Sequence, residues 1–295
     1  MARESGLQSP TARGMAVAIT PCMNTQEGIS ALRGHWPEYL IEGWALGMFM
    51  ISAGLVTTLF DYPGSPVNHA LRDGDLRRVL IGICMGLTAM ALIYSPWGRR
   101  SGAHMNPAVT LTFLRLGHVA PWDAMFYILA QFLGGTLGVL VVLVFVGDAF
   151  AQPPVRYVAT LPGMRGVSVA LLAEFAISFA MMTAILRTSN SQQLMRYTGV
   201  LAGVLVATWI SVEGPLSGMS MNPARTFASA LPGNVWTGFW LYMIAPVAGM
   251  QAAAALFTWQ RGRGAVKCSK LIHAADQRCI HCGYEPSALA REAMS

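Results

Sequence analysis

The sequence predicts an all-α membrane protein with six transmembrane helices and two short re-entrant half-helices, built as an inverted two-fold repeat. The first observation is composition: of 295 residues, 54% are hydrophobic and only 12% are charged, which is too apolar for an ordinary soluble domain. The second is a set of long apolar stretches, most of them near the ~20 residues that a membrane-spanning helix needs. The third is an eight-residue frame that occurs twice, at 101–108 and 217–224, with six of eight positions identical. Such a repeat indicates two versions of one unit.

Six apolar stretches are expected to span the membrane. They are 37–60, 78–95, 120–146, 168–186, 197–212 and 235–259. Turn-forming residues separate them, as in the Pro- and Gly-rich segment 147–167. Glycines four residues apart inside the spans, such as Gly43 and Gly47 or Gly134 and Gly138, predict close contacts between helices.

Each copy of the repeated frame ends in Asn-Pro-Ala. The residues are Asn106, Pro107, Ala108, Asn222, Pro223 and Ala224. Asn is a favoured helix N-cap and Pro is favoured at the first helical position, so each triplet predicts a helix start. The apolar run that follows is too short to cross a membrane, which predicts a half-helix that lines a wet cavity. We expect the two positive helix ends to meet near the midplane, with each Asn NH2 group free to donate into a pore. One such triplet could be an ordinary loop segment, but two in the same frame favour the half-helices.

These motifs resemble the major intrinsic proteins, the aquaporins and glycerol facilitators. The resemblance rests on the Ser-Gly-Ala-His-x-Asn-Pro-Ala-Val-Thr form at 101–110, on Asn-Pro-Ala-Arg at 222–225, and on Glu42, Glu174, Gln131 and Pro246. It implies an aquaporin-like channel domain at 37–259, with repeats at about 37–146 and 168–259, one pore per subunit and a homotetramer. It also implies passive passage of water and small uncharged solutes, with exclusion of ions and protons.

Two carboxylates, Glu42 and Glu174, occupy the same place in the opening span of each repeat. A carboxylate inside a span is costly and needs a buried partner. One interpretation is a proton relay. The resemblance favours a structural role, in which each carboxylate accepts hydrogen bonds from the backbone of a re-entrant loop. It likewise implies that His104 packs within such a loop and that Gln131 is a buried structural residue.

The resemblance further implies a selectivity filter of four residues. They match Arg225, Met219, Ile210 and either Met85 or Gly86. Water-selective members place His at the third position and an aromatic residue at the fourth, and glycerol facilitators have Asp where this chain has Thr226. Because the sequence departs from both patterns, we expect a wider filter that admits small neutral solutes of the glycerol, urea or metalloid-acid type. Arg225 is expected to donate to solutes and to repel cations.

The segment after the last span is rich in Cys and His. Cys268, His273, Cys279 and Cys282 include a Cys-x-x-Cys-Gly turn of the kind that holds zinc. These four residues are the candidate ligands of a zinc site in the tail, and a reduced tail with incidental cysteines is the alternative. Transport itself is expected to require no cofactor.

Positive charge predicts the orientation in the membrane. Fourteen of the 20 Lys and Arg residues flank the side that carries the termini, and five lie in the loops opposite. The positive-inside rule therefore predicts cytoplasmic tails, at 1–36 and 260–295, on a multi-pass protein of the plasma or inner membrane. The N-terminal tail is expected to be mostly disordered. The net charge of +6 arises in tails and loops, so no nucleic-acid partner is expected.

Two other functions stay open. Inverted repeats with broken helices also build ion-coupled secondary transporters, which would show saturable, ion-coupled flux. A structural membrane protein with weak permeability would fold normally and show little flux. An enzyme is not expected, because the sequence shows no nucleophile–base pattern, no Gly-rich phosphate loop and no metal cluster within the spans.

Overall fold

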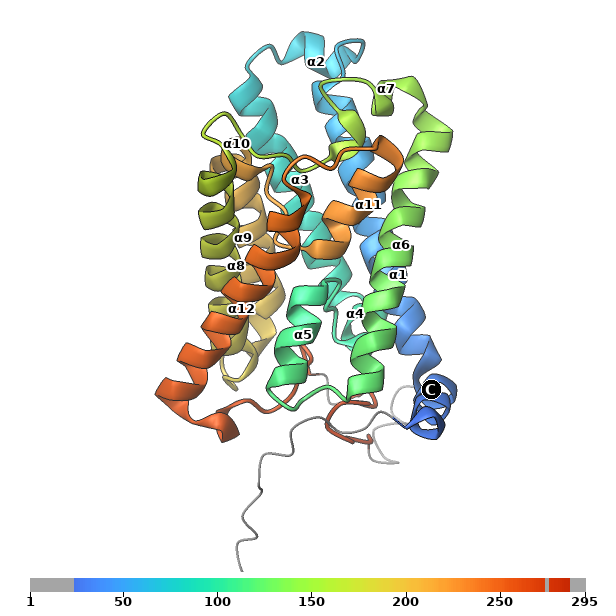
Figure 1. Ribbon diagram of the computed structural model, residues 1–295, viewed down its shortest axis with the longest axis vertical. Coiled ribbons are helices and arrows are strands. Elements are labelled where there is room, and N and C mark those ends of the chain that lie inside the picture. The colour runs from blue at the N-terminus through green and yellow to red at the C-terminus, as the bar shows by residue number, and fades with distance from the viewer. Residues whose placement is uncertain (1–23, 274–275, 287–295) are drawn as a thin grey trace, which may run out of the picture.

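The computed structural model describes residues 24–273 and 276–286 of the chain. Within these residues all regular secondary structure is helical, and six helices are long and apolar enough to cross a membrane (Figure 1). They are α1 (Thr25–Asp61), α3 (Gly74–Tyr94), α6 (Pro121–Val146), α8 (Val167–Ser189), α9 (Thr198–Val212, extended by a 3₁₀ turn at Met195–Tyr197) and α12 (Phe239–Arg261). The predicted all-α membrane fold is confirmed.

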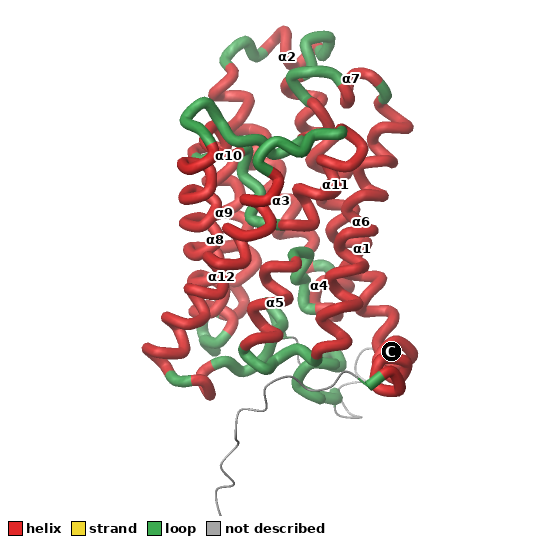
Figure 2. The backbone as a smooth tube through the Cα atoms, viewed as in Figure 1, coloured by secondary structure: helices red, strands yellow, loops and turns green. Residues whose placement is uncertain are grey.

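Two shorter helices, α5 (Pro107–Arg115) and α11 (Pro223–Gly233), follow the repeated frame. Asn106 and Asn222 cap them with side-chain oxygens, and Pro occupies the first turn of each. Figure 2 shows them one above the other in the middle of the bundle, each reached from a different end of the molecule. They are therefore the expected re-entrant half-helices.

The two ends of the bundle differ, and Figure 1 shows them at top and bottom. The end that carries α2 (Pro66–Ala70) and α7 (Asp148–Ala151) is called the loop side. The opposite end carries the described residues that follow α12 and is called the tail side.

The long helices pack in the same way in both repeats. In the first repeat α1 packs along α6, in the second α8 packs along α12, and α3 packs against α9 between the repeats. Glycine permits this close approach: a Cβ on Gly134 would lie 2.0 Å from the carbonyl oxygen of Gly43, and a Cβ on Gly86 would lie 2.5 Å from that of Gly203. Backbones therefore touch directly where the small residues lie.

The predicted disordered tail at 1–36 is wrong from Thr25 onward, because α1 begins there. The Asn24 side chain caps this helix, and the backbone carbonyl oxygen of Asn24 accepts a hydrogen bond of 3.1 Å from the Trp122 indole. A local cap and a distant contact therefore set the start of the helix, and hydropathy reports neither. Residues 1–23 lie outside the described residues.

The two loops that lead into the half-helices contain unpredicted helical turns, α4 (Pro96–Ser101) and α10 (Gly214–Ser217). Each ends in a glycine with positive φ, at Gly102 (108°) and Gly218 (79°). These glycines are the second residues of the repeated frame, so the frame encodes a helix stop as well as the helix start that follows.

Candidate functional site

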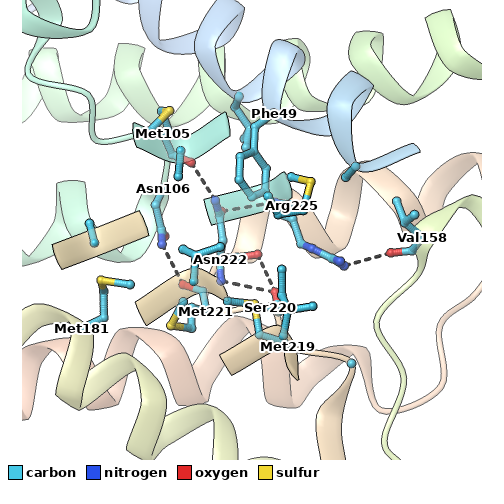
Figure 3. Close-up of a pocket in the computed structure, with 18 of the residues that line it drawn as sticks. Phe49, Met105, Asn106, Val158, Met181, Met219, Ser220, Met221, Asn222 and Arg225 are labelled. Atoms are coloured by element: carbon cyan, nitrogen blue, oxygen red, sulfur yellow. Dashed lines mark hydrogen bonds between the residues drawn. The ribbon is translucent and has the colours of Figure 1, made fainter. Parts of the chain in front are cut away.

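A cavity of ≈ 440 Å³ lies between the two repeats. At the loop side its lining includes Asp61 and Arg78, and at the tail side it includes Leu271. Asn106 and Asn222 line it where the two half-helices begin (Figure 3). The cavity therefore extends along the bundle and passes both Asn-Pro-Ala turns.

The two Asn side chains hold the turns together across the repeats. Asn106 Nδ2 donates to the Met221 carbonyl oxygen at 2.7 Å, and Asn222 Nδ2 donates to the Met105 carbonyl oxygen at 2.6 Å. Each Oδ1 meanwhile accepts from its own helix start. The expectation that the NH2 groups are wholly free is therefore wrong, because one N–H of each is used. An amide NH2 carries two donors, so one N–H per Asn remains for the cavity.

The segments before the half-helices have the same unusual backbone in both repeats. Ala103 and Met105 have φ of 56° and 49°, and the matching Met219 and Met221 have φ of 50° and 53°. Left-handed backbone is unfavourable for residues with a Cβ, so these four conformations need support from their surroundings.

Glu42 supports the first segment. Its side chain is fully buried in the interior of α1. Its carboxylate accepts hydrogen bonds from the Ser101 hydroxyl (2.7 Å), from His104 N (3.0 Å) and from Met105 N (2.6 Å). Gln131 Nε2 adds a fourth at 2.9 Å. The carboxylate thus satisfies backbone donors that the irregular loop would otherwise leave buried and unpaired.

Glu174 supports the second segment in the same way. It is also fully buried, and it accepts hydrogen bonds from the Ser217 hydroxyl (2.6 Å), from Ser220 N (2.7 Å) and from Met221 N (2.7 Å). The correspondence with Glu42 reproduces the two-fold repeat at the level of single hydrogen bonds.

His104 lies inside the first loop and is almost fully buried, at 3% exposed. One ring nitrogen lies 3.1 Å from the Thr110 hydroxyl, and the other lies 3.0 Å from the Ser269 carbonyl oxygen. The ring therefore joins α5 to the C-terminal tail, a contact that sequence reasoning did not predict.

Arg225 lies at the start of α11 and lines the cavity. Its Nη1 donates to the Val158 carbonyl oxygen at 3.0 Å, and its backbone N–H donates to Asn222 Oδ1 at 3.2 Å. Thr226 points elsewhere: its hydroxyl lies 2.6 Å from that of Ser220. Thr226, which directly follows Arg225, therefore supports the loop before α11 with a neutral hydroxyl group.

The other predicted filter positions divide into two sets. Ile210, Met219 and Met85 line the same cavity as Arg225. Gly86 is not part of that lining and packs against α9, where no side chain would fit. Of the two candidates from the second span, Met85 is therefore the one that faces the cavity.

Two further groups in the cavity were missed from the sequence. Phe49 projects into it from α1, and the carbonyl of Val158 orients Arg225 (Figure 3). A helical spacing of cavity residues in α1, at Leu46, Phe49 and Ala53, could have indicated Phe49. No pattern in the sequence marks Val158, because it acts through its backbone.

The candidate zinc ligands come together on the tail side. The ligand atoms of Cys268, His273, Cys279 and Cys282 all lie within 4.8 Å of one another. A hydrogen bond between the first and third thiols lowers the pKa of Cys279 and raises the pKa of Cys268. The set is compatible with zinc in residue type and in spacing.

Comparison with protein-family models matches residues 35–257 to the model described as major intrinsic protein. Among curated proteins, the chain is 38% identical over 183 residues to "Probable aquaporin NIP-type" of Nicotiana alata, which covers 60% of this chain and 64% of that protein. The match thus spans a little less than two thirds of that relative. "Probable aquaporin NIP4-2" of Arabidopsis thaliana is 37% identical over 244 residues, with 81% and 82% covered.

Among solved structures, the aquaglyceroporin of Plasmodium falciparum resembles this fold with a TM-score of 0.63. The match covers 76% of this chain and 95% of that chain at 18% identity. At this identity the likeness establishes the fold alone.

Proposed function

Because the chain belongs to the major intrinsic protein family, we propose that it is a passive channel for water and for small uncharged solutes of the glycerol, urea or metalloid-acid type. The family consists of membrane channels and not of enzymes. Ions and protons are excluded, and transport needs no cofactor.

Two capped half-helix ends meet in the cavity, and this arrangement supports the proposal most strongly. Helix N-termini carry partial positive charge, so both ends repel cations from the same point. A water molecule between Asn106 and Asn222 accepts from the remaining amide N–H groups with its oxygen. Its own protons then point away on both sides. A continuous chain of donors is interrupted there, which disfavours proton transfer.

The filter is assigned to Arg225, Met219, Ile210 and Met85, which share the cavity lining. Arg225 supplies a fixed cation and hydrogen-bond donors, and its guanidinium is oriented by a backbone carbonyl. The other three side chains are apolar and two are flexible thioethers. A solute with CH groups on one side and hydroxyl or amide groups on the other fits this mixed lining better than it would fit a lining of polar groups alone.

Stopped-flow light scattering on proteoliposomes tests this function. A sucrose gradient is expected to give fast shrinkage, and a glycerol gradient is expected to give fast shrinkage followed by fast re-swelling. Shrinkage without re-swelling would restrict the channel to water. No flux above that of empty liposomes would contradict the channel and favour a structural membrane protein.

An ion-coupled transporter is less well supported. Glu42 and Glu174 are the carboxylates that could carry a proton, yet both accept several hydrogen bonds from the re-entrant loops. Protonation would replace an acceptor by a donor that faces other donors. We therefore assign both carboxylates, together with His104 and Gln131, to structural support of the turns.

We assign the channel domain to 37–259, with α1 continuing toward the N-terminus, and propose that four copies assemble. Exposed leucines along α6, among them Leu133 and Leu137, offer an apolar face to lipid or to a neighbouring subunit. Native mass spectrometry is expected to give about four times the chain mass of 31.7 kDa. The positive-inside rule supports a cytoplasmic tail side, and we propose that the membrane is a plasma or inner membrane. Labelling of an introduced Gln193→Cys thiol, at an exposed position between α8 and α9, by an impermeant maleimide from the cytoplasmic side alone would support this orientation.

A further inference from the structure

We propose that Cys268, His273, Cys279 and Cys282 bind one Zn²⁺ ion, and that the metal holds the tail as a cap in which Leu271 narrows the tail side of the cavity. The metal site stands on the ligand geometry alone. The effect of the cap on flux rests on the proposed channel function.

Two pairs of ligand atoms already lie close to the separations that a tetrahedral zinc site needs, and all four atoms lie within 4.8 Å of one another. Cys268 Sγ lies 3.4 Å from Cys279 Sγ, and His273 Nε2 lies 3.2 Å from Cys282 Sγ. Ligand atoms on a tetrahedral zinc ion are separated by about 3.5–3.8 Å, given Zn–S and Zn–N bonds of about 2.3 and 2.0 Å. Three thiolates and one imidazole form a closed set that is typical of structural zinc sites.

The backbone from Cys279 to Gly283 forms a tight hydrogen-bonded turn. Gly283 N donates to the Cys279 carbonyl oxygen at 3.0 Å, and Gly283 has a φ of 71°, which favours glycine. Cys279 N donates in turn to the Tyr284 carbonyl oxygen at 2.9 Å. The turn therefore presents two thiols from a short loop. A cavity of ≈ 250 Å³ lined by Cys268, His273 and Cys282 offers a path by which the ion can enter.

The tail is attached to the loop that carries the first Asn-Pro-Ala turn. The Ser269 carbonyl oxygen contacts His104 Nε2 at 3.0 Å, and Leu271 N donates to the Gly102 carbonyl oxygen at 3.2 Å. Both tail residues lie between the first two ligands in the sequence. The metal site and the re-entrant loop are therefore joined through a few backbone hydrogen bonds.

A second contact comes from the turn itself. His281 Nε2 lies 3.3 Å from the Ser101 carbonyl oxygen and 3.3 Å from the Tyr127 hydroxyl. Its ring stacks on that of His104, with 5.9 Å between centroids. Because His281 lies between Cys279 and Cys282, fixing those two thiols also fixes this contact.

Leu271 is the part of the cap that reaches the cavity. It is 4% exposed and lines the cavity together with Ile93 and Ala103. Among the described residues of the tail, Val266 and Leu271 are buried apolar side chains besides the two buried cysteines, and a segment this small needs a metal or a disulfide to hold its shape. Removal of zinc is therefore expected to release Leu271 and to open the tail side.

Metal content of the 295-residue chain, purified under reducing conditions, tests the site. Inductively coupled plasma mass spectrometry is expected to find one zinc per chain in the natural sequence and in Cys84→Ser, whose thiol lies in α3 away from the cluster. Cys279→Ser is expected to lose it. Retention of zinc by Cys279→Ser would overturn the assignment, and so would a natural chain without zinc.

A second measurement covers the case in which Cys279→Ser misfolds. The natural chain is stripped with a chelator and titrated with Co²⁺, which is expected to give intense thiolate-to-cobalt absorption that Zn²⁺ then removes. Absence of this band would overturn the site. So would a Cys268–Cys279 disulfide that persists under reducing conditions in the intact mass.

Water permeability in proteoliposomes tests the cap. A membrane-permeant zinc chelator is expected to raise the permeability severalfold. Leu271→Ala is expected to show the raised value with zinc still bound, and to be insensitive to the chelator. Ile272→Ala, whose side chain is not part of the cavity lining, is expected to behave like the natural chain. Equal permeability with and without zinc would overturn the cap. No flux in either state would refute the proposed channel and leave the metal result standing.

Discussion

Ile210 presents a branched apolar side chain to the cavity that Arg225 also lines. Replacement by His adds a donor and a planar ring, so Ile210→His is expected to narrow the filter and to favour water. The ratio of glycerol to water permeability should fall about tenfold, since a pocket that loses or gains one polar contact discriminates by about that factor or more. Stopped-flow measurements in matched proteoliposomes give this ratio.

Ile210→Leu is the matched control, because it conserves volume and adds no donor. Its permeability ratio should stay near that of the natural chain. An unchanged ratio in Ile210→His would show that this position does not set the filter.

Glu213 lies just beyond the loop-side end of α9 and is only 5% exposed. Burial, reinforced by the charge of Glu174, raises its pKa from 4.5 to about 8. Between pH 4.5 and about pH 8, Glu213 keeps its proton in the folded state and releases it in the unfolded state. The free energy of unfolding therefore falls as the pH rises through this range. Thermal unfolding in detergent should therefore show a lower Tm at pH 8 than at pH 5.

In Glu213→Gln the titrating group is absent, and most of this decline in Tm should disappear. Glu27→Gln, an exposed carboxylate on α1, should keep the decline. If Glu213→Gln and the natural chain lose stability in parallel, another group is responsible.

At the scale of single residues, the sequence predicted the side chains whose types are unusual for their setting. Glu42, Glu174 and Arg225 are charged residues in apolar surroundings, and Asn106 and Asn222 mark helix starts. The carbonyl oxygens of Met105 and Met221, which accept from these Asn side chains, could not be predicted. A backbone group is present at every position, and only the fold decides which one faces a donor.

At the scale of the elements, the close contact between α1 and α6 depends on Gly134. A Cβ there would lie 2.0 Å from the Gly43 carbonyl oxygen, so Gly134→Ala must push α1 and α6 apart. We expect a loss of about 1–3 kcal/mol, which is typical of overpacking. The Tm of the purified protein should fall by several degrees.

Gly34→Ala is the control, because Gly34 lies in α1 with nothing near its missing Cβ. Alanine favours helix there, so stability should stay equal or rise slightly. A similar fall of Tm in both variants would mean that glycine content, and not the contact between α1 and α6, matters.

The elements themselves were largely predictable. All six spans and both half-helices lie where hydropathy and the Asn-Pro-Ala triplets place them. The start of α1 and the turns α4 and α10 were missed. The start of α1 is polar and the two turns are short, so hydropathy, which responds to long apolar runs, does not report them.

At the scale of the whole molecule, the two half-helices should make the channel permeable to water but not to protons. A pH-sensitive dye inside proteoliposomes, with a proton gradient and valinomycin to balance charge, should report no flux above that of empty liposomes. The barrier arises because two positive helix ends face the same point of the cavity.

Gramicidin in the same liposomes is the positive control for the dye. Proton flux that Glu174→Gln abolishes would contradict a passive channel and favour the ion-coupled transporter.

The repeat made the global architecture predictable. The contact between the tail and the first re-entrant loop was not, because it joins segments that share no pattern in the sequence.

The two hydrogen bonds that Asn106 and Asn222 donate to carbonyl oxygens of the opposite repeat also affect how the chain folds during its synthesis. Asn106 needs a partner 115 residues further along the chain, so the first half-helix leaves the ribosome well before its contact exists. At about 5–20 residues per second, this delay is roughly 6–23 s. A nascent chain that ends before Met221 should leave Ala108 open to solvent, although Ala108 is fully buried in the finished protein. With Ala108→Cys, a water-soluble maleimide should label the truncated chain and spare the complete one. We therefore expect the first repeat to exist during synthesis without its Asn106 contact until the second repeat has been made.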